Sequence, residues 1–425
     1  MDFKLDKAIM KNILMIAYHF PPVRVSSGIQ RTLKFANYLL DHDWKALVLT
    51  VDPRAYDNIN SDQMREIPSE VVVKRAFALD TARHLSLKGR YLGWMALPDR
   101  WVSWCVGGGG SGLALIKQYR PKVLWSTYPI ATAHLLGLIL HRLSGIPWIA
   151  DFRDSMTEDG YPAEPKQRKV YRWIEQQTVT HCTRAVFTTP GAIAMYAARY
   201  PHIPKSRWVL IPNGYDEENF ARAEQSELLA QALQEKQKQI VLLHSGILYP
   251  SERDPTQFFK ALAALKKAGK IKASTFKVIL RATGHDHLHR QSIQQFSLEE
   301  IVFLEPSIAY EKALAEMLVV DGLLVFQASN CNHQIPAKIY EYLRAKRPIL
   351  ALTDPDGDTA KVLLDAGLAA SIAPLDDEIA IANLISGFID NARLERSAIA
   401  SDEIIASHSR QARTKLLAQL LDEVS

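Results

Sequence analysis

Short apolar runs and amphipathic helical stretches alternate along almost the whole chain, and this alternation most limits how the chain can fold. Apolar runs of this kind are typical of parallel strands that helices cover on both faces. The alternation extends from Asn12 to Ile211 and starts again at Ile240. It therefore predicts an α/β protein with two successive Rossmann-like, doubly wound parallel-sheet domains.

The predicted elements of the first domain include helices over residues 28–41 and 131–143. Its predicted strands are 12–17, 46–51, 71–75, 123–126, 148–151, 185–188 and 209–211. The alternation of the second domain comprises 240–244, 256–268, 276–281, 301–304, 312–317, 322–326 and 338–345. The run Gly107 to Gly110 predicts a flexible spot.

The domain boundary is predicted at Ile211-Pro212-Asn213-Gly214, because Asn-Gly after a proline favours a turn. The predicted domains are residues 1–212 and 213–404, and a chain of 425 residues is long enough for two separate cores. Residues 405–425 are expected to form a helix that crosses back to the first domain, because its leucines need a packing partner. Two such domains would face each other across an interdomain cleft at the carboxyl ends of their strands.

Several protein classes are excluded by composition. The three cysteines, Cys105, Cys182 and Cys331, are far apart and form no C-x-x-C pair, so neither a disulfide framework nor a zinc site is indicated. No apolar run reaches the roughly 18 to 20 residues that a membrane span needs. The beginning of the chain lacks the pattern of a signal peptide, so a cytoplasmic location is expected.

Charge is distributed unevenly along the chain. Residues 1–210 contain 28 basic and 17 acidic residues, a net charge of +11, whereas the remainder has 23 and 29, a net charge of −6. A basic half points to an anionic partner, either an acidic membrane surface, a nucleic acid or a phosphorylated acceptor, unless it is merely a solvated surface. No nucleic-acid reader motif accompanies it. The stretch from Arg83 to Trp104 mixes basic and aromatic residues, which suits peripheral contact with an anionic membrane, although such aromatics also occur in cores.

Two groups of polar residues follow predicted strands of the first domain. His19 comes after the first strand, and Ser26-Ser27-Gly28 opens the next helix, whose free N–H groups suit a phosphate or a polar substrate group, or need only a cap. Asp151-Phe152-Arg153-Asp154 ends another strand. This acidic and basic cluster could orient an acceptor hydroxyl or accept its proton, and it could also be a structural ion pair.

The second domain carries its candidates at two strand ends. Gly246 and Arg253 follow the strand 240–244, and the planar fork of an arginine suits a diphosphate. Lys338 lies where a loop enters a helix, a place that favours anion binding. Glu341, three residues later on the same helical face, could accept hydrogen bonds from ribose hydroxyls.

These motifs together resemble glycosyltransferase family 4, the retaining, nucleotide-sugar-dependent class with the GT-B fold, over nearly the whole chain. The phrases that carry the resemblance are Tyr18-His19-Phe20-Pro21-Pro22 with Gly28, Pro98-Asp99-Arg100 with Trp104, Pro147-Trp148-Ile149-Ala150-Asp151-Phe152-Arg153-Asp154, Ile211-Pro212-Asn213-Gly214-Tyr215-Asp216, Ser245-Gly246 and Lys338-Ile339-Tyr340-Glu341-Tyr342-Leu343. Their order and spacing are specific, although each phrase alone is weak.

The resemblance implies that the second domain binds the nucleoside diphosphate, with Arg253 at the position of a diphosphate-binding lysine and Glu341 at that of the ribose-binding glutamate. Two departures affect this donor site. His333 stands where the first of the family's paired glutamates belongs, and Ile247 replaces its usual arginine, so Lys338 is expected to supply the missing cation.

Site roles follow from these motifs and the resemblance together. The candidate catalytic residues are Asp151, Arg153, Asp154, Arg253 and Lys338. The candidate donor-binding residues are Gly28, Gly246, Arg253, His333, Lys338 and Glu341. The candidate acceptor-binding residues are His19, Asp151, Arg153 and Asp154.

The predicted function is transfer of a sugar, of hexosyl type, from a nucleoside diphosphate sugar to a glycan or lipid-linked acceptor, with retention, in surface-polysaccharide synthesis. The resemblance implies no metal and no cofactor, and no Asp-x-Asp lies in a loop suited to a metal ion. Two alternatives stay open: a sugar-nucleotide epimerase or hydrolase on the same scaffold, and a catalytically silent nucleotide-sugar-binding protein, which the His333 and Ile247 departures would explain.

Overall fold

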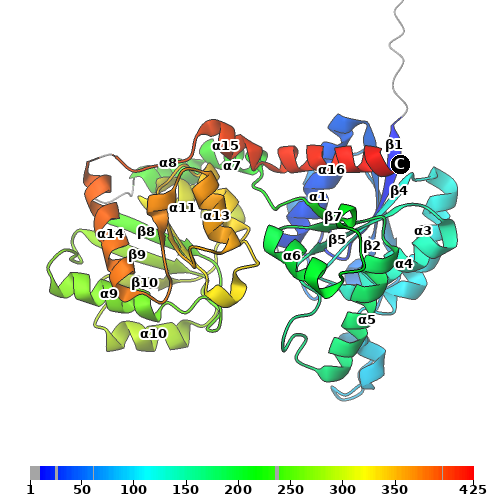
Figure 1. Ribbon diagram of the computed structural model, residues 1–425, viewed down its shortest axis with the longest axis horizontal. Coiled ribbons are helices and arrows are strands. Elements are labelled where there is room, and N and C mark those ends of the chain that lie inside the picture. The colour runs from blue at the N-terminus through cyan, green and yellow to red at the C-terminus, as the bar shows by residue number, and fades with distance from the viewer. Residues whose placement is uncertain (1–9, 24–26, 61, 235–238, 395) are drawn as a thin grey trace, which may run out of the picture. The chain divides into compact units, whose positions relative to one another are not determined.

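Two compact units make up the chain (Figure 1). The computed structural model describes residues 10–23, 27–60, 62–234, 239–394 and 396–425. Residues 1–213 and 410–425 form the first unit, and residues 214–409 form the second. The C-terminal segment of the first unit thus begins at 410 rather than 405, because helix α15 (Asp402–Ser407) belongs to the second unit.

The first unit is built on a parallel sheet of seven strands in the order β3-β2-β1-β4-β5-β6-β7. The strands are β1 (Lys11–Ile16), β2 (Trp44–Val51), β3 (Val72–Ala76), β4 (Val123–Thr127), β5 (Trp148–Arg153), β6 (Arg184–Phe187) and β7 (Trp208–Leu210). The helices between them are α1 (Ser27–Tyr38), α2 (Thr81–His84), α3 (Trp104–Tyr119), α4 (Ala131–Ser144), α5 (Pro165–His181) and α6 (Pro190–Arg199). The central strands β1, β4 and β5 are mostly buried, which explains why they are largely apolar.

The four consecutive glycines lie inside helix α3, so the prediction of a flexible spot is wrong. A Cβ on Gly107 would lie 2.2 Å from the carbonyl oxygen of Phe77, and one on Gly108 would lie 2.6 Å from a methyl group of Leu136. The absence of side chains lets α3 approach its neighbours closely. Tertiary packing here overrides the low helix propensity of glycine.

The C-terminal helix α16 (Arg410–Val424) packs against α1 in the first unit. Its buried Leu417, Leu420 and Leu421 join the core of that unit. An exposed ion pair between Asp422 and Lys11 adds a polar contact to β1. The leucines of this helix therefore find their packing partner on the first unit.

The second unit contains a parallel sheet of six strands in the order β10-β9-β8-β11-β12-β13. The strands are β8 (Ile240–Ser245), β9 (Phe276–Arg281), β10 (Val302–Glu305), β11 (Gly322–Phe326), β12 (Ile349–Leu352) and β13 (Ile372–Ala373). The helices before α15 are α7 (Glu217–Glu224), α8 (Glu227–Gln234), α9 (Thr256–Lys267), α10 (Asp286–Gln295), α11 (Tyr310–Val319), α12 (Lys338–Arg344), α13 (Asp358–Asp365) and α14 (Glu378–Arg393). The prediction of two parallel-sheet α/β domains is confirmed.

Each sheet has a point where the chain reverses its direction of strand addition. In the first unit this point lies between β1 and β4, and in the second it lies between β8 and β11. Loops at the carboxyl ends of the two strands diverge there, which leaves a crevice where open α/β sheets bind ligands. Both groups of candidate residues lie beside these points.

Candidate functional site

Lys338 lies at the strand reversal of the second unit, directly above the end of β8. It is the first residue of α12, and its Nζ donates a hydrogen bond to the carbonyl oxygen of Ser245 at 2.6 Å. Gly246 has a φ of +134°, and a Cβ there would lie only 2.4 Å from that Nζ. A glycine is therefore required at 246 both for its backbone conformation and to make room for the lysine.

His244 lies beneath the same ammonium group, although the sequence analysis did not single it out. Its Nε2 is 3.4 Å from Lys338 Nζ, and its Nδ1 is 2.8 Å from the carbonyl oxygen of Leu324. Burial and the neighbouring Lys338 hold the pKa of His244 well below its usual value, so the ring is neutral at pH 7. The available signal was a histidine in the otherwise apolar strand β8.

Lys338 is a half-buried cation that interacts with a second cation, Arg253, and with the carboxylate of Glu341. Burial, assisted by the charge of Arg253, lowers the pKa of Lys338 to about 7, while Glu341 opposes this shift. The ammonium form is therefore only partly populated near neutrality. A bound polyanion would favour that form, so the seat is suited to a diphosphate.

Arg253 lies on the loop between β8 and α9 and folds back over it. Its Nη1 donates to the carbonyl oxygen of Ile247 at 3.0 Å, and its guanidinium lies 5.5 Å from the centre of the Tyr249 ring. Because Arg253 acts on the pKa of Lys338, the two cations belong to one electrostatic group. The structure thus brings Arg253, Lys338 and Gly246 together.

Glu341 lies one turn after Lys338 and receives a hydrogen bond from another helix. The hydroxyl of Tyr310, the first residue of α11, donates to Glu341 Oε1 at 2.7 Å. Sequence reasoning missed Tyr310 because nothing in the local pattern joins two residues that are 31 positions apart.

His333 lies in the loop that leads from β11 to α12. Gln327 holds this loop, since its Nε2 donates to the carbonyl oxygens of Cys331 at 2.6 Å and Gln334 at 2.9 Å. His333 itself is half-buried and precedes the helix start at Lys338 by five residues. The assignment of His333 to donor binding stays a prediction.

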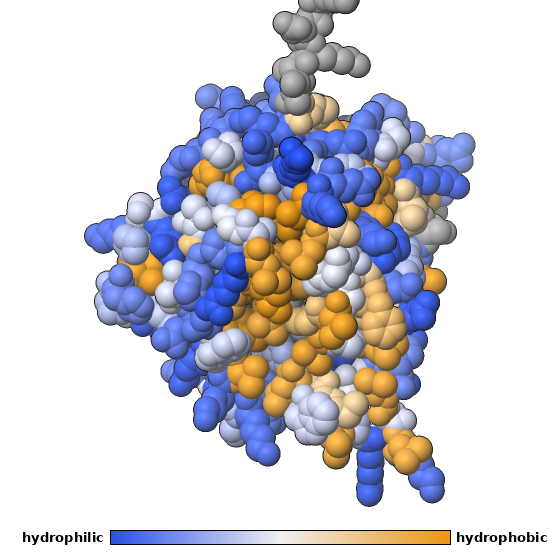
Figure 2. Space-filling view, turned by 90° about the vertical axis from the view of Figure 1, so that its right-hand side faces the viewer, coloured by the Kyte–Doolittle hydropathy of each residue, from blue (hydrophilic) through white to orange (hydrophobic). Residues whose placement is uncertain are grey.

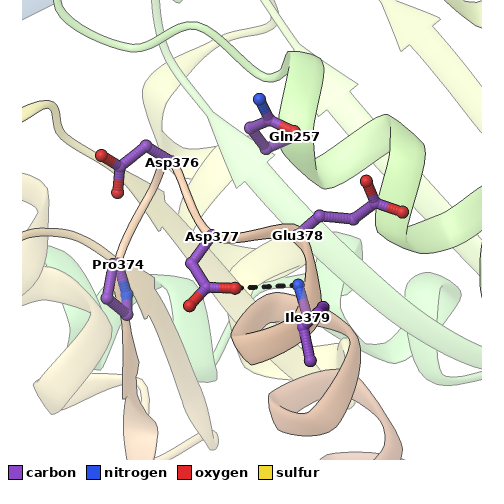
Figure 3. Close-up of a pocket in the computed structure, with 6 residues that line it drawn as sticks. All are labelled: Gln257, Pro374, Asp376, Asp377, Glu378 and Ile379. Carbon is purple, nitrogen blue, oxygen red and sulfur yellow. Dashed lines mark hydrogen bonds between the residues drawn. The ribbon is translucent and has the colours of Figure 1, made fainter.

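A separate acidic hollow lies at the N-terminus of α14 (Figure 3). It is lined by Gln257, Pro374, Asp376, Asp377, Glu378 and Ile379. Asp377 is the N-cap of α14, and its carboxylate accepts from the backbone N–H of Ile379 at 2.9 Å (Figure 3). Its acidic lining disfavours a diphosphate, and none of the predicted site residues contributes to it.

In the first unit, Asp151 forms a buried ion pair with Arg31. It is fully buried, and it accepts two hydrogen bonds from Arg31, at 3.0 and 2.7 Å, and one from Thr127 Oγ1 at 2.9 Å. Arg31 also donates to the carbonyl oxygens of Ile211 and Pro212. Asp151 thus belongs to a buried ion pair, and its assignment to catalysis and acceptor binding stays a prediction.

Arg153, two residues later, differs from Asp151 in both conformation and partners. Its φ of +58° lies in the left-handed region, which is strained for a residue other than glycine. Its Nη1 lies 3.5 Å from the carbonyl oxygen of Gly28 and 3.4 Å from that of Tyr128. Strain of this kind is frequent at functional sites, and it places the guanidinium beside the first turn of α1. Ser26 lies outside the described residues.

His19 and Asp154 complete this group at the strand reversal of the first unit. Burial, together with the charge of Arg153, lowers the pKa of His19 to about 4, so this imidazole is neutral. The side chain of Asp154 is exposed, unlike that of Asp151. The structure thus groups His19, Gly28 and Arg153, with Asp154 next to them at the end of β5.

Among the residues that the structure describes, no group of three or more histidine, cysteine, aspartate or glutamate side chains could hold a metal ion. Within the same described ranges, no helix is both long enough and apolar enough to cross a membrane.

Residues 28–214 match the model of a family described as a glycosyl transferase 4-like domain. Residues 28–214 form a glycosyl transferase 4-like domain. This match confirms the predicted glycosyltransferase family, and it includes Gly28, Arg153 and Asp154 but not His19. Retention and the hexosyl type stay predictions. A comparison with curated protein sequences finds no match.

Solved structures resemble the glycosyl transferase 4-like domain and the second unit together. Sucrose-phosphate synthase from Thermosynechococcus elongatus is 14% identical, with 97% of this chain and 98% of that chain covered and a TM-score of 0.67. Anabaena HepE in complex with UDP-glucose is 14% identical, with 97% and 100% covered and a TM-score of 0.65. UDP-GlcNAc 2-epimerase from Neisseria meningitidis is 12% identical, with 97% and 100% covered and a TM-score of 0.56. At these identities the likeness shows the fold alone.

Proposed function

We propose that this protein transfers a sugar of hexosyl type from a nucleoside diphosphate sugar to a glycan or lipid-linked acceptor, with retention, in surface-polysaccharide synthesis. The observation that carries the proposal is the seat of Lys338 on the carbonyl oxygen of Ser245, beside Gly246 and at a strand reversal. A half-buried cation at a helix start suits a diphosphate. The complex of HepE with UDP-glucose shows that a protein of this fold accepts such a donor.

The proposed chemistry needs positive charge where the sugar leaves. As the bond between sugar and diphosphate breaks, negative charge grows on the diphosphate, and Lys338 and Arg253 stabilise it. Glu341 accepts hydrogen bonds from ribose hydroxyls. His19, Arg153 and Asp154 of the first unit bind the acceptor, whose hydroxyl attacks the face that the diphosphate leaves and transfers its proton to the departing phosphate. The reaction so written needs neither a cofactor nor a protein nucleophile.

The fold leaves a second candidate, because UDP-GlcNAc 2-epimerase shares it. An epimerase or hydrolase would consume a nucleotide sugar without an acceptor. A silent binding protein would bind the donor and leave it intact. These functions differ in one measurable property, namely the requirement for an acceptor.

A panel of nucleotide sugars tests the proposal. Titration calorimetry on the full chain identifies which nucleotide sugar binds, and chromatography then follows that donor with and without glycan and lipid-linked acceptors. We expect one donor to bind and to be consumed only with an acceptor, with the anomeric configuration retained in the product. Consumption without any acceptor would favour the epimerase or hydrolase, and an absence of binding by every donor would reject all three functions.

Replacement of Glu341 by glutamine tests the ribose contact. We expect the free energy of binding of the nucleoside diphosphate to weaken by about 1 to 3 kcal/mol, the cost of losing a charged acceptor. Glu378→Gln, in the acidic hollow, is the matched control and should bind as the wild type does. Equal affinities for the two variants would remove Glu341 from the donor site.

Some apolar residues of the segment from Arg83 to Trp104 are exposed, as membrane contact requires, and others are buried. Leu87, Leu92 and Trp94 are 80%, 62% and 69% exposed, whereas Trp101 is half-buried against the core and Trp104 is fully buried. Aromatic residues of the segment thus divide between surface and core. Figure 2 shows that apolar side chains also gather in a band on the face that it presents.

A tight turn presents part of this segment. Lys88 and Gly89 both have positive φ, and the backbone groups of Leu87 and Arg90 exchange two hydrogen bonds at 2.8 and 3.0 Å. This geometry is that of a two-residue hairpin turn. It places the exposed Leu87 beside two exposed basic residues, Lys88 and Arg90, which suits a surface of anionic lipid. We propose peripheral binding to such a surface on the cytoplasmic face.

Liposome flotation tests this binding. Each basic residue near an anionic surface contributes on the order of 1 kcal/mol, so we expect binding that requires anionic lipid and falls as salt rises. Leu87→Ser with Trp94→Ala should weaken it, whereas Ile379→Ser, which changes an exposed apolar residue of the second unit, should not. If the wild type ignores anionic vesicles at low salt, the membrane is not its partner.

A further inference from the structure

We propose that Tyr310 positions the nucleotide donor: its hydroxyl orients the Glu341 carboxylate toward the ribose, and its exposed ring forms a stacking face for the nucleobase. This inference rests on the proposed function and deepens it, because it adds a residue that discriminates among nucleotides.

The hydrogen bond between Tyr310 and Glu341 joins the beginnings of two helices. Tyr310 begins α11 and Glu341 lies in the first turn of α12. Both helices pack on the same side of the sheet, since buried Leu314 of α11 and Ile339 of α12 belong to one core cluster. The hydrogen bond of 2.7 Å from the tyrosine hydroxyl to Oε1 therefore spans neighbouring helices that the core already holds in place.

Orientation matters because a glutamate side chain has three rotatable bonds. A carboxylate that is already held by a neighbouring hydroxyl loses less conformational freedom when it binds the ribose hydroxyls. Lys338, on the same helix, lies one turn away and binds the diphosphate in the proposed function. Fixing Glu341 relative to Lys338 thus sets the distance between the ribose contact and the diphosphate contact.

The ring of Tyr310 is the basis of the proposed contact with the nucleobase. The side chain is 42% exposed although its hydroxyl is hydrogen-bonded, so the exposed part includes the ring. In a nucleotide the base is attached to the carbon next to the one that bears the 2′-hydroxyl. A ring tethered to the carboxylate that binds the ribose therefore lies near the base, and tyrosine rings stack on the flat faces of bases.

Two substitutions separate the hydroxyl from the ring. Tyr310→Phe removes only the hydroxyl, and Tyr310→Leu removes the ring as well. We expect Tyr310→Phe to lower the affinity for the nucleoside diphosphate by about three- to tenfold relative to the wild type, the range for one hydrogen bond. Tyr310→Leu should weaken it further and change the ranking of UDP, ADP and GDP. Tyr119→Phe, in the first unit, is the control and should leave all affinities unchanged.

A double-mutant cycle with Glu341→Gln tests whether Tyr310 acts through Glu341. We expect Tyr310→Phe to cost little once Glu341 is glutamine, because the oriented carboxylate is already lost. Inorganic pyrophosphate, which has neither ribose nor base, should bind the wild type, Tyr310→Phe and Tyr310→Leu equally and so report that the diphosphate seat is folded. With the active enzyme, Tyr310→Phe should raise KM and leave kcat nearly unchanged.

The outcomes distinguish this inference from the proposed function. If the wild type binds a nucleoside diphosphate and Tyr310→Phe binds it equally well, or if the two substitutions are additive, the role of Tyr310 is wrong and the proposed function stands. If Tyr310→Leu leaves the ranking of the three nucleotides unchanged, the stacking face is wrong. If the wild type binds no nucleoside diphosphate, both the inference and the proposed function fall.

Discussion

Arg31→Ala is expected to lower the free energy of unfolding by about 3 to 5 kcal/mol, the loss typical when one partner of a buried ion pair is removed. Arg31 and Asp151 are both almost completely buried, and the guanidinium contacts both carboxylate oxygens. Without Arg31, the carboxylate would stay in the core with only Thr127 as a hydrogen-bond donor. Urea denaturation, followed through the transition of the first unit, measures the effect.

The control is Arg54→Ala, because Arg54 pairs with Asp52 at the surface, where their side chains are 60% and 33% exposed. Solvent screens such a pair, so its loss should cost less than about 1 kcal/mol. Arg31→Met combined with Asp151→Leu should recover much of the stability, since the double change leaves no unpaired charge. A loss for Arg31→Ala as small as that of the control would show that the pair is not an anchor.

Arg31, one partner of this ion pair, also holds the segment where residues 1–213 of the first unit end. Arg31 donates to the carbonyl oxygens of Ile211 and Pro212, and Arg413 of α16 donates to that of Asn213. Local turn chemistry alone predicts a boundary at Pro212-Asn213-Gly214. The side chains from α1 and from the last helix that hold these carbonyls could not be predicted, because such contacts join residues far apart in the chain.

Local pattern was sufficient wherever burial alone decides the structure. The strands 276–281 and 322–326 have the predicted bounds, since both are mostly buried, and 322–326 is buried and apolar throughout. Local pattern failed at Gly107 to Gly110, where glycine predicts flexibility and close packing against Phe77 and Leu136 imposes a helix. Helix propensity is a weak constraint compared with such packing.

The candidate sites show the same division. The location of Lys338, Gly246 and Arg253 near one another could be predicted, because strand ends and a helix start place them at one edge of the sheet. The role of Asp151 could not be predicted, since its partner Arg31 lies 120 residues away and only the fold brings them together. Asp99 is similar, because it accepts from the backbone N–H and the hydroxyl of Thr132 in the first turn of α4.

Lys338→Met is expected to lower kcat by about 100- to 1000-fold with a smaller change in KM, as is typical when a group that stabilises growing negative charge is lost. Arg253→Ala should act in the same direction. The control is Lys361→Met, which changes an exposed lysine of α13 and should leave kcat at the wild-type value. An unchanged kcat with a raised KM would show that Lys338 contributes to ground-state binding only.

The pH dependence of the wild type provides a sharper test of Lys338. The groups around its ammonium are the carbonyl oxygen of Ser245, the neutral ring of His244, the cation Arg253 and the carboxylate Glu341. Burial and Arg253 lower the pKa of Lys338 to about 7, so the amine is charged below that pH and neutral above it. The diphosphate favours the charged form, so a proton must be taken up on donor binding above pH 7.

The affinity for a nucleotide sugar should therefore be highest below pH 7 and should fall as pH rises through it, by up to about tenfold per pH unit. Both phosphates of a nucleotide sugar are diesters, so the donor itself does not titrate in this range. Calorimetry in buffers of different ionisation enthalpy, at pH 8, should detect a proton taken up by the wild type and none by Lys338→Met. Equal proton uptake by the two proteins would place the titrating group elsewhere and remove Lys338 from the diphosphate seat.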